Sequence, residues 1–198
     1  KIFELFSKAK CPHRITVGVY EQVTEKDIDL NGNSLSRYRS ECARRKVHDF
    51  SDNIRVVTAD ASEARGPMSA RAIIEKTMYR NERYIMTIDS HMRFIDSWDV
   101  EVLDLYKDCL AYTARPILST IPPNYNRGTN LPDDQRATYL AVDRVDSLGF
   151  PILKSLPFEK PPNRCYGSIF YCPCFSFAFG ALIKEVPCDI YYDYVFFA

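Results

Sequence analysis

An acidic and an imidazole side chain stand two residues apart where an apolar run ends, at Asp89 and His91 after Tyr84–Ile88. Residues i and i+2 of an extended segment point to the same side, so these two side chains can converge on one cation. A carboxylate with an imidazole suits Mn²⁺, Zn²⁺ or Fe²⁺, whereas Mg²⁺ is more often held by oxygens alone. The pair therefore predicts a metal site at a strand end. The alternative is structural, with Asp89 capping the next segment and His91 lying on the surface.

The seven cysteines cannot form a complete disulfide framework, because their number is odd and they lack two paired Cys-x-x-Cys motifs. We expect them to be thiols in the core or in loops. The closest pair, Cys172 and Cys174, leaves a redox or zinc site open. No asparagine stands in an Asn-x-Ser/Thr sequon, which agrees with a reducing, unglycosylated compartment. The cysteines are Cys11, Cys42, Cys109, Cys165, Cys172, Cys174 and Cys188.

Composition and charge exclude several classes of protein. The chain has 198 residues with 46% hydrophobic content, which is enough for one sizeable core, and we expect a single domain over residues 1–198. Lys plus Arg and Asp plus Glu are equal at 26 each, so the zero formal charge gives no general attraction to nucleic acid or an anionic membrane. No apolar run approaches the roughly 20 residues of a membrane span. We therefore expect neither nucleic-acid binding nor membrane contact by this chain.

The spacing of apolar residues predicts strands that alternate with helices, which is typical of an α/β fold. Strands are predicted at Arg14–Tyr20, Ile54–Thr58, Tyr84–His91, Ile117–Ile121 and Tyr139–Val145. Helices are predicted at an amphipathic start containing Ile2, Leu5, Phe6 and Ala9, around Ser40–Val47, and at Met68–Asn81 and Trp98–Tyr112. The polar stretch Asn124–Arg136 indicates a surface loop of the kind that reaches a partner. Prolines divide residues 151–173 into strand fragments.

Four segments, in this order and spacing, resemble the glycosyltransferases that transfer GlcNAc to polypeptides, a family that includes a cytoplasmic enzyme acting on hydroxyproline. They are Arg14–Val19, Ala64–Arg71, Ile88–Phe94 followed by Trp98-Asp99, and Ile117–Thr120. The resemblance extends over nearly the whole chain, and in it Asp-Ser-His takes the place of the usual Asp-x-Asp motif. It implies a GT-A-like nucleotide-sugar-binding fold, with a mixed, mainly parallel central sheet flanked by helices.

The resemblance also implies an enzyme that moves GlcNAc from UDP-GlcNAc to a protein hydroxyl, on hydroxyproline, threonine or serine. Asp89 and His91 would bind Mn²⁺, or another divalent cation, that bridges the diphosphate of the donor. Asp89 would also approach the ribose, and Ser90 would shape the turn between the two ligands. Retention of the anomeric configuration is expected, and the leaving diphosphate can take the acceptor's proton. We therefore assign no catalytic base.

Residues of the first two strands complete the implied nucleotide site. Val17, Gly18 and Val19 would form one wall of the uridine pocket, although Gly18 is also explained by a need for close packing. Asp60 follows the second strand, where it would contact the base or, equally, stabilise a turn.

Two arginines near a chain break are the implied phosphate ligands. Arg71 and Arg65 would lie near the nucleotide or its phosphates, and the Gly66–Pro67 break would allow close backbone approach. The alternative for both arginines is a solvated helix face. Trp98 and Asp99 would border the sugar or acceptor site, with a core anchor as the alternative for Trp98.

The match continues through Phe175–Gly180 and Val186–Asp189, and the chain then ends at Ala198, where the family has an acidic Gly-Glu-Glu-like segment. That segment is expected to contact the donor sugar and to precede a further metal ligand, so we expect a catalytic domain truncated at its C-terminus. Two other functions stay open: an inactive nucleotide-sugar-binding homologue or incomplete fragment, and a metal or redox module based on Cys172 and Cys174. We expect a cytoplasmic location, with the Golgi lumen as the alternative if an N-terminal anchor is missing.

Overall fold

The computed structural model describes residues 1–123, 136, 138–160 and 165–194, and the chain divides into two compact units. Unit 1 consists of residues 1–83, 93–100 and 180–198, and unit 2 consists of residues 84–92 and 101–179. Each unit has its own strands and its own buried aromatic cluster.

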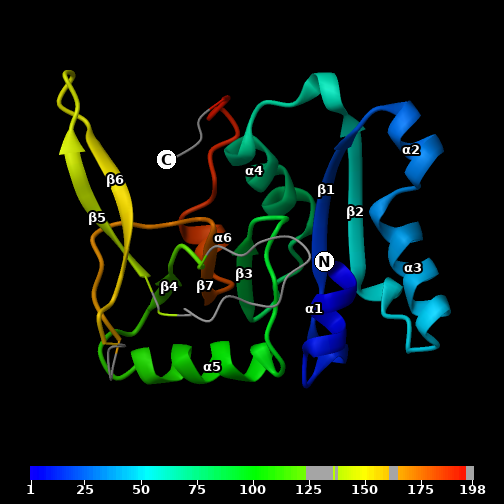
Figure 1. Cartoon of the computed structure of the whole chain (residues 1–198), viewed down its shortest axis with the longest axis horizontal. Coiled ribbons are helices and arrows are strands. Elements are labelled where there is room, and N and C mark those ends of the chain that lie inside the picture. The colour runs from blue at the N-terminus through cyan, green and yellow to red at the C-terminus, as the bar shows by residue number, and fades with distance from the viewer. Residues whose placement is uncertain (124–135, 137, 161–164, 195–198) are drawn as a thin grey trace. The chain divides into compact units, whose positions relative to one another are not determined.

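Unit 1 is built around two parallel strands, β1 (Val17–Val23) and β2 (Ile54–Asp60). Figure 1 shows α3 (Ser34–Arg45) and α4 (Pro67–Met78) on either side of this pair. The helix α4 contacts β1, and α3 contacts β2. The remaining elements are α1 (Ile2–Lys8), α2 (Glu25–Asn31), α6 (Leu182–Glu185) and the 3-10 helices η1 (Pro12–Arg14), η2 (Ser51–Asn53) and η3 (Ala61–Glu63).

Local sequence signals set the ends of the two flanking helices. The side chain of Asn33 accepts a hydrogen bond from the backbone amide of Ser36 at 2.8 Å and so caps α3. Lys46 ends that helix in the left-handed conformation. At the start of α4, Gly66 has φ +93°, and Pro67 occupies the first turn, where its missing N–H leaves no helical hydrogen bond unmade. The chain can therefore turn sharply from η3 into α4.

Aromatic side chains of α1 and α3 form part of the core of unit 1. Phe6 stacks on Phe50 with ring centroids 5.3 Å apart and packs against Tyr38 at 5.6 Å. The hydroxyl oxygen of Tyr38 accepts a hydrogen bond from the backbone amide of Phe50 at 3.1 Å. Burial raises the pKa of Tyr38 well above its usual value, so the phenol stays neutral in this core.

Unit 2 contains a three-stranded antiparallel sheet in which β7 (Phe175–Phe179) lies between β3 (Tyr84–Ile88) and β4 (Ile117–Ser119). Rings from its strands and from α5 pack together: Tyr84 lies 5.4 Å from both Tyr106 and Phe177. The helix α5 spans Trp98–Cys109, and its residues from 101 onward belong to this unit. A disulfide joins Cys109, at the end of α5, to Cys165.

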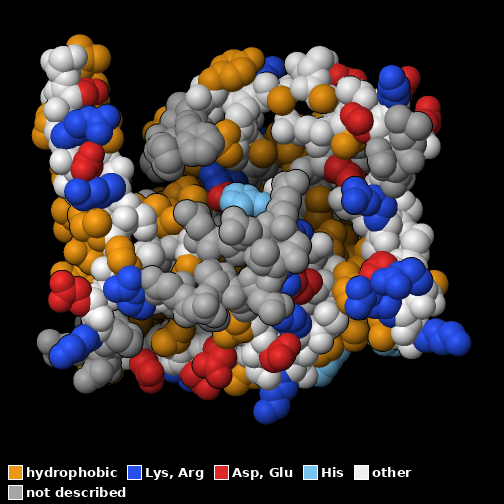
Figure 2. Space-filling model, viewed as in Figure 1, with side chains coloured by type: hydrophobic (Ala, Val, Ile, Leu, Met, Phe, Trp, Pro, Cys, Tyr) orange, Lys and Arg blue, Asp and Glu red, His pale blue; other side chains and the backbone are white. Residues whose placement is uncertain are grey.

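The second sheet of unit 2 is the antiparallel hairpin of β5 (Thr138–Val145) and β6 (Pro151–Pro157). Figure 2 shows charged and hydrophobic side chains interspersed along it. Asp143 pairs with Arg144 and Lys154, each at 2.9 Å, and the register shifts between Val142 and Arg144. Charges and a bulge on an exposed strand discourage its pairing with another chain.

The α/β class predicted from the sequence is confirmed, but a mainly parallel central sheet is not found in the described residues. There the strands form three small sheets, of which the β1–β2 pair is parallel and the other two are antiparallel. The difference arises because β7, which the sequence analysis did not predict as a strand, lies antiparallel between β3 and β4. Strand order of this kind is not encoded by apolar spacing, which reports only which residues face a core.

The predicted elements form, with shifted ends. The first strand begins at Val17 and not at Arg14, because residues 12–14 turn in η1. The third strand ends at Ile88 and not at His91. The helices α4 and α5 end at Met78 and Cys109, a few residues before their predicted ends.

Two further expectations concern the cysteines and the predicted loop. The expectation of free thiols is wrong for Cys109 and Cys165, whose Cα atoms lie 5.6 Å apart although 56 residues separate them in the sequence. The predicted loop Asn124–Arg136 lies outside the described residues except for Arg136. No described helix is long and apolar enough to cross a membrane.

Candidate functional site

The Asp-Ser-His segment forms a turn at the end of β3. The backbone amide of Asp89 donates to the carbonyl of Cys174 at 3.1 Å, and the amide of Met92 donates back to the carbonyl of Asp89 at 3.3 Å. The segment is therefore not extended, and the premise that Asp89 and His91 share one side because of strand alternation is wrong. Asp89 is half-buried, while Ser90 and His91 are exposed. Any convergence of the acid and the imidazole depends on this turn.

The chain before β7 lies next to the same turn. The hydroxyl of Ser119 accepts from the backbone amide of Cys172 at 2.6 Å and donates to its carbonyl at 3.0 Å, which fixes the segment beside β4. Burial, contact with Cys172 and the nearby Asp89 raise the pKa of the Cys174 thiol to about 12. Near neutral pH, and without a bound metal, this sulfur therefore keeps its proton. A cysteine-based module at Cys172 and Cys174 stays an untested alternative.

The donor atoms of the turn suit a cation that also takes ligands from elsewhere. Across the part of the chain that the structure describes, no three His, Cys, Asp or Glu side chains are grouped so as to hold a metal ion. Asp89 and His91 supply one oxygen and one nitrogen donor, a combination that suits Mn²⁺ or Zn²⁺. A cation held by two protein ligands keeps open positions for phosphate oxygens and water.

In unit 1 the expected uridine wall begins on β1. A Cβ atom on Gly18 would lie 3.0 Å from the Sδ of Met78 and 3.2 Å from the Cγ2 of Ile74, so this glycine allows α4 to pack closely on the strand. The structure thus explains Gly18 by packing, the alternative weighed from the sequence. Val17 and Val19 are half-buried and, by strand alternation, point to the opposite face from Gly18.

Asp60 stabilises the turn that follows β2. Its Oδ1 accepts hydrogen bonds from the backbone amide of Ser62 at 2.8 Å and from the Ser62 hydroxyl at 2.5 Å. These bonds lower the pKa of Asp60 below its usual value. Its contacts are those of a turn-forming aspartate, while a contact with a base stays a prediction.

The backbone at the start of α4 is approached closely, as expected, but the group that approaches it is the backbone of Tyr194. The backbone amide of Tyr194 donates to the carbonyl of Arg65 at 2.6 Å. A Cβ atom on Gly66 would lie 3.2 Å from the Cα of Tyr194, and the φ of +93° also favours glycine there. The exposed guanidinium of Arg65 lies 3.6 Å from the carboxylate of Asp193.

Farther along α4, Arg71 and Glu75 stand one turn apart on the same face of the helix. The Nη1 of Arg71 contacts the Sδ of Met68 at 3.5 Å. Glu75 accepts two hydrogen bonds from Cys188, one from its backbone amide at 2.9 Å and one from its thiol at 3.3 Å. The helix therefore carries both an arginine proposed from the sequence and a contact that the sequence analysis missed.

Trp98 and Asp99, expected near the sugar or acceptor, make structural contacts. The indole N–H of Trp98 donates to the carbonyl of Leu5 at 2.9 Å, which agrees with the alternative of a core anchor. Asp99 is buried and accepts from the backbone amides of Lys10 and Cys11 at 2.7 and 2.8 Å. Trp98 therefore binds α1, and Asp99 holds the segment that follows this helix.

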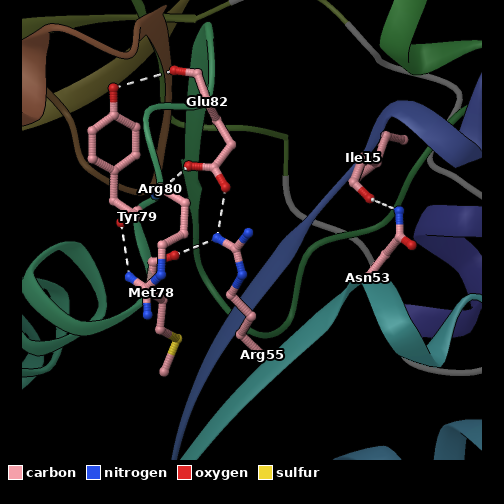
Figure 3. Close-up of polar contacts among 7 residues, drawn as sticks. All are labelled: Ile15, Asn53, Arg55, Met78, Tyr79, Arg80 and Glu82. Carbon is pink, nitrogen blue, oxygen red and sulfur yellow. Dashed lines mark hydrogen bonds and ion pairs between the residues drawn. The ribbon is translucent and has the colours of Figure 1, made fainter.

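An ion pair fixes the connection between α4 and β3, as Figure 3 shows. The guanidinium of Arg55 donates to Glu82 at 2.6 Å and also to the carbonyl of Met78. Burial raises the pKa of Glu82, but hydrogen bonds from backbone amides, including that of Arg80, and from Arg55 outweigh it and lower the pKa below its usual value. The hydroxyl of Tyr79 donates to the carbonyl of Glu82 at 3.2 Å. This network holds the chain just before it enters the strand that leads to Asp89.

We expect Arg55→Met to lower the free energy of unfolding by about 1–3 kcal/mol, because Glu82 and the Met78 carbonyl both lose a charged donor. A carboxyl whose folded pKa is lowered stabilises the protein above its unfolded pKa, and this contribution is lost as the pH falls through the folded pKa. The difference between variant and wild type should therefore shrink below about pH 4. Urea unfolding at neutral and acidic pH measures it, with Arg80→Met as the control. A difference that does not change with pH would argue against the ion pair.

Comparison with protein families gives one decisive finding. A family model described as Glycosyltransferase (GlcNAc) matches residues 29–197. The chain belongs to the GlcNAc glycosyltransferase family. Neither curated proteins nor solved structures give a significant match.

The family match confirms the resemblance seen in the sequence and includes the Asp-Ser-His turn and all of α4. Within this GlcNAc glycosyltransferase domain, the candidate residues divide between the two units. Asp89, Ser90 and His91 belong to unit 2, and the other candidates belong to unit 1. Of the latter, Val17, Gly18 and Val19 lie outside the matched span, whereas Asp60, Arg65 and Arg71 lie inside it.

Proposed function

We propose that this GlcNAc glycosyltransferase is a metal-dependent enzyme with a GT-A-like fold that moves GlcNAc from UDP-GlcNAc to a protein hydroxyl. The observation that carries the proposal is the family match over residues 29–197, which supports transfer of GlcNAc. UDP as the leaving group, a hydroxyproline, threonine or serine acceptor, and retention at the anomeric carbon follow from the resemblance of the motif segments. One catalytic domain over residues 1–198 stays part of the proposal.

The metal proposal rests on the chemistry of the turn after β3. Asp89 and His91 would hold Mn²⁺ or another divalent cation, and Ser90 gives the turn its exposed tip. When bound, the cation would offset negative charge on the departing diphosphate. The hydrogen bond from the Asp89 amide to the Cys174 carbonyl fixes the backbone of the first ligand, and such anchoring limits the reorganisation needed on binding.

Cationic side chains on α4 and directly before it would bind the diphosphate. Arg71 and Arg65 bear guanidinium groups, which pair with phosphate oxygens in a fixed, two-pronged geometry. The acceptor hydroxyl would lose its proton to a phosphate oxygen of the leaving group on the same face of the sugar. This route needs no protein base, and we assign none.

A donor screen tests the proposed reaction. We expect purified protein with Mn²⁺ to release UDP from UDP-GlcNAc faster than from UDP-GalNAc or UDP-glucose, by water or by transfer to hydroxyproline-, threonine- or serine-containing peptides. Release is measured as UDP, and transfer as the added mass of one N-acetylhexosamine on the peptide. Preference for another donor would overturn the assignment of the sugar, and addition of Mg²⁺, Zn²⁺ or chelator in place of Mn²⁺ tests the cation.

One observation favours a second candidate, an inactive homologue that binds nucleotide sugars. The described residues contain no group of three side chains able to hold a metal, so a cation at this turn would depend on ligands that the described side chains do not supply. This candidate predicts that UDP binds but that no donor is turned over with any of the acceptor peptides. Measurable turnover would exclude it.

The location is also a proposal. Free thiols and absent sequons favoured the cytoplasm, but the Cys109–Cys165 disulfide is typical of an oxidising compartment. We therefore propose the alternative, the Golgi lumen, over the cytoplasm. Protection of the protein from added protease in intact membrane vesicles, and its loss on detergent treatment, would support the lumen. Digestion without detergent would return the assignment to the cytoplasm.

A further inference from the structure

The segment of residues 188–194 lies against α4 and is attached to it at two places. At the first, one carboxylate oxygen of Glu75 accepts a hydrogen bond from the backbone amide of Cys188 at 2.9 Å. The other oxygen accepts a hydrogen bond from the Cys188 thiol at 3.3 Å. Both oxygens of one carboxylate are thus used on a single residue. Since 113 residues separate Glu75 and Cys188 in sequence, this contact sets where the 188–194 segment runs.

The second attachment lies at the other end of the segment, directly before α4. Tyr194 donates its backbone amide to the carbonyl of Arg65 at 2.6 Å, and its backbone passes so close to Gly66 that a Cβ atom there would lie 3.2 Å away. The carboxylate of Asp193 lies 3.6 Å from the guanidinium of Arg65. Both the backbone and the side chain of Arg65 therefore have partners in this segment.

The start of α4 has no side-chain cap of its own, so the outside contacts at Arg65 are side-chain and backbone contacts that the helix itself does not supply. Gly66, its N-cap residue, has no side chain to accept from the first turn, and no side-chain capping bond is present. The peptide that carries Arg65 is consequently held by the 188–194 segment. Arg71 lies between the two attachments on the same helix, one turn before Glu75.

We propose that Glu75 is a positioning residue for the phosphates of the donor. By fixing Cys188, it keeps the 188–194 segment on α4, and the segment in turn holds Arg65 at the start of that helix. The inference rests on the proposed function, because it takes these two arginines as the ligands of a nucleoside diphosphate.

A positioning role and a purely electrostatic role of Glu75 predict opposite changes in UDP affinity. Glu75 is an anion one helical turn from Arg71, so its direct effect on a bound diphosphate is repulsive. Neutralising it would then tighten UDP binding if charge alone mattered. A positioning role requires the reverse, since the lost attachment frees Arg65. We expect Glu75→Ala to weaken UDP binding about three- to tenfold, the range of one hydrogen bond's net contribution, and Glu75→Gln to weaken it less.

Two readouts test this on the full chain. Calorimetry with UDP and Mn²⁺ gives the affinity of the wild type, Glu75→Ala and Glu75→Gln, with the exposed Glu63→Gln as a control that removes the same charge near Arg65. Alkylation of Cys188, followed by peptide mass spectrometry, reports the contact independently of any ligand. Burial and the Glu75 carboxylate raise the pKa of this thiol to about 12, so both Glu75 variants should be alkylated faster.

Faster alkylation of Cys188 with weaker UDP binding, while Glu63→Gln binds UDP at least as tightly as the wild type does, would support the positioning role. Faster alkylation with unchanged or tighter UDP binding would overturn it and leave Glu75 a structural residue only. An unchanged alkylation rate would also overturn the positioning role, because it would show that Glu75 does not hold Cys188. If the wild type itself does not bind UDP, the donor proposal fails, and this inference fails with it. That outcome is distinguishable from the others because it is seen in the wild type, without any variant. If Glu75→Ala does not fold, Glu75→Gln should change UDP affinity and the alkylation rate of Cys188 in the same directions.

Discussion

Replacing Asp89 with asparagine and His91 with alanine is expected to remove Mn²⁺-dependent UDP binding, with a loss of affinity of at least about 100-fold. Changing residues that merely support metal ligands already costs roughly 10–100-fold in metal affinity or activity, so loss of both ligands should exceed that range. The asparagine keeps the size of the side chain but loses its charge. Since the turn is fixed by backbone hydrogen bonds of Asp89, the exchange should leave the fold intact.

Calorimetric titration of UDP with and without Mn²⁺ measures this effect. The matched control is Asp96→Asn with His48→Ala, which makes the same two chemical changes at exposed positions. Binding by the wild type and the control that depends on Mn²⁺ and disappears in the Asp89 and His91 variant would support the site. Equal binding by all three proteins, without metal dependence, would remove the Asp-Ser-His turn as a metal site.

Replacing Cys109 and Cys165 by serine is expected to lower the free energy of unfolding by about 2–4 kcal/mol. The disulfide closes a loop over a sequence separation of 56 residues and so restricts the unfolded chain, although part of such an effect is enthalpic. It also ties Cys165 to the end of α5, whose Tyr106 packs in the core of unit 2.

Urea unfolding of the double variant, and of the wild type with and without dithiothreitol, measures the effect. Cys11→Ser, which removes one of the described free thiols, is the control and should change stability by much less. Reductant should destabilise the wild type and leave the double variant unaffected. A wild type that titrates as seven thiols before any reductant is added would show that the disulfide is not formed in solution.

Apolar periodicity was sufficient to predict the elements that carry the candidate residues. The strand at Ile54 and the helices α4 and α5 appear where the sequence places them, because each buries one face with the period of its own secondary structure. The strand β7 was missed although Phe175, Phe177 and Phe179 alternate with smaller residues, a pattern typical of a strand.

The candidate site was predictable in position but not in geometry. The sequence placed Asp89 at a strand end, where it lies, but a turn and not an extended strand leads to His91. It also indicated a close backbone approach at Gly66, yet the group that approaches is Tyr194. Contacts between residues far apart in the chain, such as that of Glu75 with Cys188, leave no trace in local spacing.

The central position of β7 affects how the chain folds during its synthesis. Among the described strands, β3 and β4 pair only through β7, which begins at Phe175, more than fifty residues after β4 ends at Ser119. At about 5–20 residues per second, the ribosome needs roughly 3–11 s to make that connection, whereas the β5–β6 hairpin within it can form in microseconds. A nascent chain therefore holds two apolar strands without their shared partner for seconds. Chaperones that bind exposed strand edges would act on unit 2 during this interval.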